Sequence, residues 1–205
     1  MNKTSNIFVI SAPSGGGKTS LVNGLLEQVD NLRLSISYTT RDKREGEEHG
    51  KNYYFVKEDE FKRMQSESKF IEDAEVFGNY YGTAKEKVTK LLDEGIDVVL
   101  EIDWQGAKQI KENFPEALLI FVLPPGLDTL KQRLESRAKD DSQTIQRRLS
   151  QATHEISNYK LFDYLVVNDD FNECLGQIIS IVNATRLKRS RRELDLRDLL
   201  KKLIP

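Results

Sequence analysis

The chain has 205 residues, of which 38% are hydrophobic and 31% are charged. These values are typical of one folded domain with a sizeable core and exclude a disordered chain. The formal net charge is −2, so the overall field does not favour nucleic acid or acidic lipid. Any anion-binding site must therefore be local.

Cys174 is the single cysteine, so an intrachain disulfide is excluded. The N-terminus carries only a short apolar run at 7–10 and lacks the apolar core of a signal peptide. No apolar stretch is long enough to cross a bilayer. We therefore expect a cytoplasmic protein without membrane contact.

Short β-branched runs alternate with helical patterns along the chain, which predicts an α/β fold with a mainly parallel core sheet flanked by helices. The expected strands lie at 7–11, 97–102, 118–123 and 164–167. The expected helices lie at 18–27, 84–94, 104–113, 127–136 and 142–157, with one long helix or two over 172–203.

A glycine-rich segment joins the first strand to the first helix, which is the context of a phosphate-binding P-loop. Its residues are Ala12, Pro13, Ser14, Gly15, Gly16, Gly17, Lys18 and Thr19. The glycines allow backbone N–H groups to point at phosphate oxygens, and the helix adds its positive end. Lys18 is expected to reach the β- and γ-phosphates of a nucleoside triphosphate, and Thr19 to hold Mg²⁺.

Ala12 stands where the usual motif has its first glycine, which costs little if its φ angle is negative. The alternative interpretation of the segment is an ordinary glycine-rich turn with a surface lysine. The combination of strand, three glycines, Lys-Thr and helix argues against it.

Two stretches interrupt the alternation. Residues 32–83 carry strand-like runs at 33–38, 53–56 and 70–77 with one short helical piece, which predicts a mixed insertion beside the main sheet. Residues 134–148 are rich in Arg, Lys, Asp and Ser, which is typical of a mobile flap. Such a layout suits nucleotide phosphotransfer, because a closing lid removes water.

Arg41 and Arg44 are candidates for a bidentate grip on an acceptor phosphate, with Tyr53 and Tyr81 as phenolic donors. A solvated charged loop is the alternative.

Glu72 follows on a predicted strand. A buried carboxylate accepts from the N1–H and 2-amino groups of guanine but faces an acceptor on adenine, so it would select guanine. An exposed strand glutamate is the alternative for this residue.

Glu101 and Asp103 follow an apolar run at the end of a predicted strand, where ligand clefts of α/β proteins lie. Their spacing places both on one side of an extended chain. One is expected near Mg²⁺ and Lys18 and the other near the acceptor base. Capping of the next helix is the alternative.

Together the motifs resemble guanylate kinase. The matching stretches run in order to about Asp170, and they are SAPSGGGKTSL, SYTTRDKREGEEHGKNYYFV, FIEDAEVFGNYYGT, VVLEIDWQGA, PP at 124–125, LKQRLESRAKDDSQTIQRRLSQA and VVNDD. The phosphate loop is widely shared, whereas the T-T-R-x-x-R-x-G-E, N-Y-Y-G and E-I-D-x-Q-G motifs are more specific.

The resemblance implies a role for each matching position. Guanine contacts are implied for Ser37, Glu72 and Asp103, with Thr83 beside them. Contacts to the GMP phosphate are implied for Arg41, Arg44, Tyr53 and Tyr81. Glu101 is grouped with the GMP site, although many members carry Asp there. Arg137 and Arg148 match lid arginines that reach the transferring phosphates, and Asn168 matches a residue near the adenine of ATP. The catalytic groups would be Lys18, Arg41, Arg137 and Arg148.

The resemblance further implies one P-loop kinase domain that transfers a phosphoryl group from ATP to GMP with Mg²⁺. Its core would comprise residues 1–31, 84–126 and 159–205, its GMP-binding insertion residues 32–83, and its lid residues 127–158.

Two other functions remain open at this point. A kinase of the same fold could act on another nucleotide, and guanylate-kinase-like modules of scaffold proteins bind phosphopeptides, although they usually have eroded phosphate loops. Residues 186–202 hold eight Lys or Arg against three acids. This patch could contact nucleic acid or support homo-oligomer formation, but we favour a solvated amphipathic helix.

Overall fold

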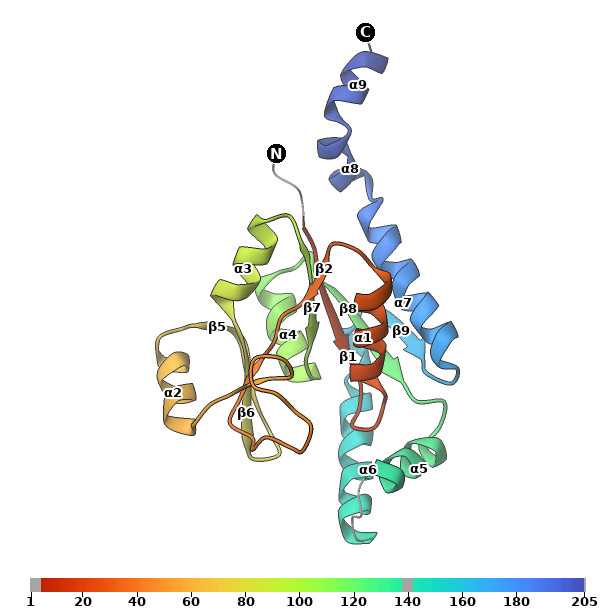
Figure 1. Cartoon of the computed structure of the whole chain (residues 1–205). Coiled ribbons are helices and arrows are strands. Elements are labelled where there is room, and N and C mark those ends of the chain that lie inside the picture. Colours follow the sequence, from red (N-terminus) through yellow and green to blue (C-terminus); the bar gives the residue numbers. More distant parts are fainter. Residues whose placement is uncertain (1–4, 138–141, 205) are drawn as a thin grey trace.

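A computed structural model describes residues 5–137 and 142–204. Its core is a five-stranded parallel sheet with the order β2-β7-β1-β8-β9 (Figure 1). The strands are β1 (Ile7–Ser11), β2 (Leu32–Leu34), β7 (Asp97–Glu101), β8 (Leu118–Leu123) and β9 (Tyr164–Val167). The predicted α/β class and parallel sheet are confirmed.

Alternate residues of the central strand β1 enter two hydrophobic cores. Phe8 and Ile10 pack with buried residues of α1 (Lys18–Gln28) and α7 (Phe171–Arg186). Ile7 and Val9 pack with the opposite core, which includes Val88 of α3 (Lys85–Asp93) and Ile110 of α4 (Trp104–Asn113). Because both faces are covered at the centre of the sheet, β1 and β8 are almost entirely apolar, as expected for parallel strands between helical layers.

A second, four-stranded sheet lies beside the core, with the order β4-β3-β6-β5. Its elements are β3 (Tyr38–Thr39), β4 (Tyr54–Phe55), β5 (Phe70–Val76), β6 (Asn79–Ala84) and the helix α2 (Glu58–Ser66). The prediction of a single strand at 33–38 was wrong, because this stretch holds parts of two strands: β2 pairs with β7 in the core, and β3 pairs with β6 in the second sheet. The expected insertion at 32–83 therefore begins with a core strand. The separate strand β6 was not predicted.

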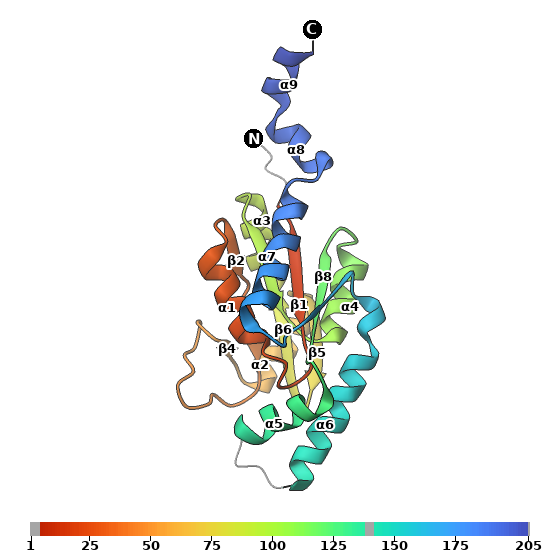
Figure 2. The ribbon, with the colours of Figure 1, turned by 90° about the vertical axis from the view of Figure 1, so that its right-hand side faces the viewer.

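Two helices extend from the carboxyl end of the core sheet: α5 (Leu127–Arg137) and α6 (Ser142–Ser157) (Figures 1 and 2). They pack on each other through Leu130, Leu134 and Ala152, which are buried. The expected flap at 134–148 thus consists partly of the ends of these two helices. Residues 138–141 lie outside the described part of the chain.

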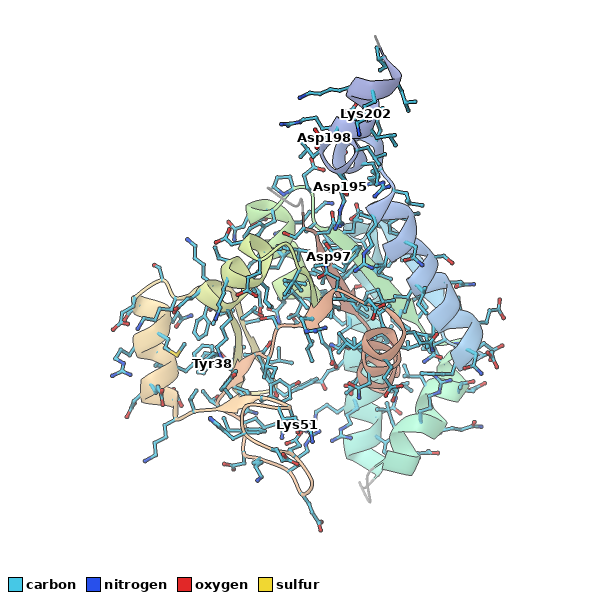
Figure 3. All side chains as sticks on the ribbon, turned by 45° about the horizontal axis from the view of Figure 1, so that its top comes forward. Tyr38, Lys51, Asp97, Asp195, Asp198 and Lys202 are labelled. Carbon is cyan, nitrogen blue, oxygen red and sulfur yellow. The ribbon has the colours of Figure 1, made fainter. Side chains whose placement is uncertain are left out.

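The C-terminal region forms three helices where one or two were expected. After α7 come α8 (Arg189–Asp195) and α9 (Arg197–Leu203), which project away from the body of the molecule (Figures 1 and 3). Asp97 anchors their base, because its fully buried carboxylate pairs with Arg186 and Arg191. Among the described helices, none combines the length and apolar character needed to span a membrane.

Candidate nucleotide-binding site

The P-loop connects β1 to α1 at the carboxyl end of the central strand. Gly15 and Gly17 have φ angles of 85° and 90°, values that side-chain-bearing residues rarely adopt. Gly17 is the N-cap of α1, so the loop presents backbone amides and the positive end of the helix in one place. Ala12 is not among the described residues with a positive φ, which removes the objection to alanine at this position.

Lys18 and Thr19, at the start of α1, reach across to the end of β7. The Nζ atom of Lys18 donates to the carbonyl oxygen of Ile102 at 3.2 Å. The Oγ1 atom of Thr19 donates to Oε1 of Glu101 at 2.6 Å. Glu101 therefore lies beside the loop rather than free at a strand end, and the hydroxyl and the carboxylate offer oxygen atoms of the kind that Mg²⁺ prefers as ligands.

Glu72 lies on β5 with only 3% of its surface exposed, which rules out the exposed alternative. The buried hydroxyl of Thr83, on the paired strand β6, donates to its Oε1 atom at 2.5 Å, and Ser37 lies 3.4 Å from that hydroxyl. Burial is the main cause that raises the pKa of Glu72 to about 7, and Asp103 raises it further. A carboxylate held this way can accept two parallel hydrogen bonds from a planar ligand edge.

Asp103 serves as the N-cap of α4, because β7 already ends at Glu101. Its Oδ1 atom accepts the backbone N–H groups of Gln105 and Gly106 at 3.1 and 3.0 Å. The capping alternative is thus confirmed, yet Asp103 also lines the same cavity as Glu72. The capping hydrogen bonds engage Oδ1, while Oδ2 accepts from the side-chain amide of Gln105 at 3.1 Å.

The loop that follows β3 is organised around Glu47. Arg41 donates two hydrogen bonds to this carboxylate, at 2.8 and 3.1 Å, and the backbone N–H of Arg44 donates a third at 2.8 Å. The hydrogen bond from Arg41 is the main cause that lowers the pKa of Glu47. This loop is ordered by an ion pair rather than simply solvated. The ring of Tyr53 lies 5.5 Å from the Arg41 guanidinium carbon, and its pKa is raised to about 12, mainly by burial.

Three neighbouring cavities are lined by most of the predicted site residues, though not by Thr83. A cavity of about 270 Å³ is lined by the entire P-loop together with Ser37, Arg44, Tyr53, Glu72, Tyr81, Glu101 and Asp103. A second, of about 560 Å³, is lined by Ser14, Arg41, Arg44, Tyr81 and Arg148, among others. A third, of about 260 Å³, is lined by Gly15, Gly17, Ser20, Arg133, Asn168, Asp169 and Phe171.

Asn168 joins the third cavity to the P-loop. Its side-chain amide donates to the carbonyl oxygen of Gly16 at 2.9 Å, and a Cβ atom at Gly17 would lie 2.5 Å from the same nitrogen. The guanidinium of Arg133 donates to the Asn168 carbonyl oxygen. Arg137 ends α5, but its side chain lies outside the described part of the structure.

The comparisons with known proteins agree with this geometry. The family model described as "Guanylate kinase" matches residues 4–185. The chain belongs to the guanylate kinase family. A guanylate kinase of Neisseria gonorrhoeae is 53% identical over 95% of both chains. One of Coxiella burnetii is 48% identical over 100% of this chain and 98% of its own. The crystal structure of guanylate kinase from Anaplasma phagocytophilum is 37% identical and superposes with a TM-score of 0.80, covering 98% of this chain and 95% of that one.

Sequence reasoning missed several residues of this guanylate kinase site. Arg147 lines the second cavity beside Arg148, and its position next to that arginine in the sequence was an available signal. Phe77 lines the first two cavities from the tip of the β5–β6 hairpin. Glu155, on α6, lines the first cavity and contacts the P-loop. No local pattern marks Phe77 or Glu155, because each reaches the site only through the packing of distant elements.

Proposed function

We propose that the chain transfers the γ-phosphoryl group of ATP to GMP, giving ADP and GDP. The observation that carries this proposal is a buried carboxylate, Glu72, in the same cavity as a complete P-loop. The loop supplies a triphosphate site, and the carboxylate supplies a means of selecting the base of the acceptor.

The donor half of the proposal uses the P-loop amides, the Lys18 ammonium group and Asn168. Lys18 would neutralise charge on the β- and γ-phosphates, and Asn168 would lie near the adenine. Thr19 would hold Mg²⁺ together with phosphate oxygens, and the adjacent Glu101 carboxylate fits this donor set. When bound, Mg²⁺ neutralises negative charge on the phosphates.

The acceptor half uses the second sheet. Glu72 would accept from N1–H and the 2-amino group of guanine, with Ser37, Thr83 and Asp103 around it. Adenine lacks the 2-amino group and presents an acceptor at N1, which would leave the buried carboxylate facing a lone pair. Arg41, Arg44, Tyr53 and Tyr81 would hold the GMP phosphate. The raised pKa of Tyr53 keeps its phenol protonated, so it remains a hydrogen-bond donor.

The proposed reaction is a direct in-line displacement, in which an oxygen of the GMP phosphate attacks the γ-phosphorus of ATP. No protein nucleophile is required, so the protein contributes positioning and charge neutralisation. Lys18 and Arg41 would act from the core and the second sheet, and Arg137 and Arg148 from the lid helices. We propose that α5 and α6 close over the phosphates and exclude water.

An acceptor-specificity assay tests the proposal. ADP release is measured with ATP and with GMP, AMP, UMP or CMP in turn, each with and without Mg²⁺. We expect turnover with GMP and Mg²⁺ and little with the other acceptors. Equal rates with AMP or UMP would overturn the guanine assignment, and full activity without a divalent ion would overturn the role of Mg²⁺.

We also propose a cytoplasmic location, which the buried and unpaired Cys174 supports.

Homo-oligomer formation is a further proposal, and exposed leucines on the projecting helices support it: Leu194, Leu199 and Leu203. Sedimentation of the full chain at increasing concentration tests it, because a concentration-independent monomer would contradict self-association.

A further inference from the structure

Glu155 joins the helix α6 to the P-loop. Its Oε2 atom accepts the backbone N–H of Ser14 at 2.9 Å, although the two residues are 141 positions apart. Its side chain lines the same cavity as Lys18 and Glu72. The contact therefore places a negative charge from the lid side of the molecule directly on a phosphate-binding loop.

The other acids of this cavity have partners that do not compete with a phosphate for a loop amide. Glu101 accepts the hydroxyl of Thr19, Glu72 accepts the hydroxyl of Thr83, and Asp103 caps α4. Glu155 differs, because it accepts a hydrogen bond from a backbone amide of the P-loop. A carboxylate resembles a phosphate in charge and in accepting hydrogen bonds through oxygen.

The electrostatic setting of Glu155 fits a carboxylate in an anion site. Burial is the largest influence and raises its pKa, whereas the Ser14 amide and the charge of Lys18 act to lower it. The same two groups are those that a triphosphate would use. A phosphate that takes up the Ser14 amide must therefore displace the Glu155 carboxylate and remain close to its charge.

We propose that Glu155 occupies a phosphate-binding amide of the loop in the nucleotide-free protein and is exchanged for a phosphate of the donor triphosphate. This inference rests on the proposed donor site at the P-loop. Glu155 then weakens ATP binding, because part of the binding free energy is used to break its contact with Ser14 and to overcome repulsion.

The part of α6 that carries Glu155 is packed against neighbouring helices, so exchange of its carboxylate for a phosphate also affects how α6 is held in place. The adjacent His154 ring contacts Trp104 of α4 edge-on, with 5.8 Å between ring centroids. Ala152, one turn earlier, is buried against Leu130 and Leu134 of α5. Release of Glu155 from the loop removes one of the contacts that tie α6 to the donor site.

The test compares Glu155→Gln with the unmodified protein in calorimetric binding of a non-hydrolysable ATP analogue with Mg²⁺. Glutamine keeps the size of the side chain but removes its charge. A hydrogen bond to a charged group is stronger than a neutral one by roughly 1 kcal/mol, so we expect binding to tighten about fivefold. The KM for ATP falls to a similar extent, while GMP binding stays unchanged. Glu135→Gln removes the same charge from an exposed position on α5 and should leave both affinities unchanged.

Unchanged or weaker binding of the analogue by Glu155→Gln would overturn the proposal, because Glu155 would then be a neutral or favourable part of the donor site. A thermal melt checks that the variant is folded. If it is not, Glu155→Ala serves instead and is likewise expected to bind the analogue more tightly. Failure of the proposed function itself would be seen separately, as absence of GDP formation by the unmodified protein.

Discussion

Thr83 and Glu72 form a hydrogen bond of 2.5 Å between two strands, at a point where both side chains are buried. The bond holds the carboxylate in one orientation within the cavity that also contains the P-loop. Burial raises the pKa of Glu72 from an ordinary 4.5 to about 7, and no basic side chain counters this increase. Protonation of Glu72 therefore falls within an accessible pH range.

The first prediction concerns pH and the acceptor. The ionised form of Glu72 is the one that accepts from both donors of guanine, so GMP binding should weaken as the pH falls below about 7. With one proton involved, the KM for GMP should rise by up to about tenfold per pH unit, whereas Glu72→Gln should abolish this dependence and raise the KM at every pH. Steady-state kinetics between pH 5.5 and 8.5 provide the measurement. A flat profile for the unmodified protein would contradict the role of Glu72.

The same shift predicts the sign of a stability effect. A folded-state pKa above the unfolded value means that the native protein binds the extra proton between about pH 4.5 and 7. The contribution of Glu72 to the free energy of unfolding should therefore decrease as the pH rises through this window. Denaturant melts of the unmodified protein and of Glu72→Gln should differ in this slope. A contribution that increases with pH would exclude a raised pKa.

The second prediction concerns Gly106, on α4. A Cβ atom at this position would overlap the Oε2 atom of Glu72, a buried side chain whose other oxygen accepts the hydrogen bond from Thr83. Gly106→Ala should thus displace the carboxylate and raise the KM for GMP by between about 10- and 100-fold, with little effect on the KM for ATP. Gly176→Ala is the matched control, because nothing lies within 4 Å of the added atom. Equal kinetics for the two variants would refute the link.

The third prediction concerns Lys18. Removal of its ammonium group should lower kcat by about 100- to 1000-fold, because stabilisation of developing phosphoryl charge is lost. GMP binding, measured by titration without ATP, should be retained, because Lys18 contacts the end of β7 rather than Glu72. Lys202→Ala removes the same charge from α9, far from the site (Figure 3), and should leave kcat unchanged. Retention of kcat by Lys18→Ala would contradict the donor site.

The fourth prediction concerns stability away from the site. Asp97 is fully buried and accepts hydrogen bonds from Asn6, Arg186 and Arg191. Asp97→Ala leaves both guanidinium groups without this partner and should lower the free energy of unfolding by about 3–5 kcal/mol. Asp195→Ala breaks a more exposed pair with Arg192 and should cost less than about 1 kcal/mol. Denaturant unfolding measures both, and equal losses would contradict the anchoring role of Asp97.

Local chemistry explains how much of the fold was predictable. The central strands are apolar on both faces because helices cover both sides of the sheet, and this pattern is visible in the sequence for β1, β7 and β8, whereas three of the four residues of the edge strand β9 are exposed. Short strands are harder to predict. β2 and β3 are separated by only three residues, yet they pair in different sheets, because hydrogen bonding to distant strands decides their membership. The strand β6 was also missed, although it pairs with its sequence neighbour β5 across a tight turn at Phe77 and Gly78.

By itself, the sequence determined the P-loop, because its glycines, lysine, threonine and flanking elements act within one short segment. The motifs around Arg41, Glu72 and Asp103 identified the family, but each residue taken alone had one structural alternative: a solvated loop, an exposed strand position or a helix cap. The tertiary structure decided that Glu72 is buried, that Asp103 caps α4 while lining the cavity, and that Glu101 bonds Thr19. It also placed Glu155 on the loop. Burial and hydrogen bonding between residues tens of positions apart arise from packing, which no local pattern of residues specifies.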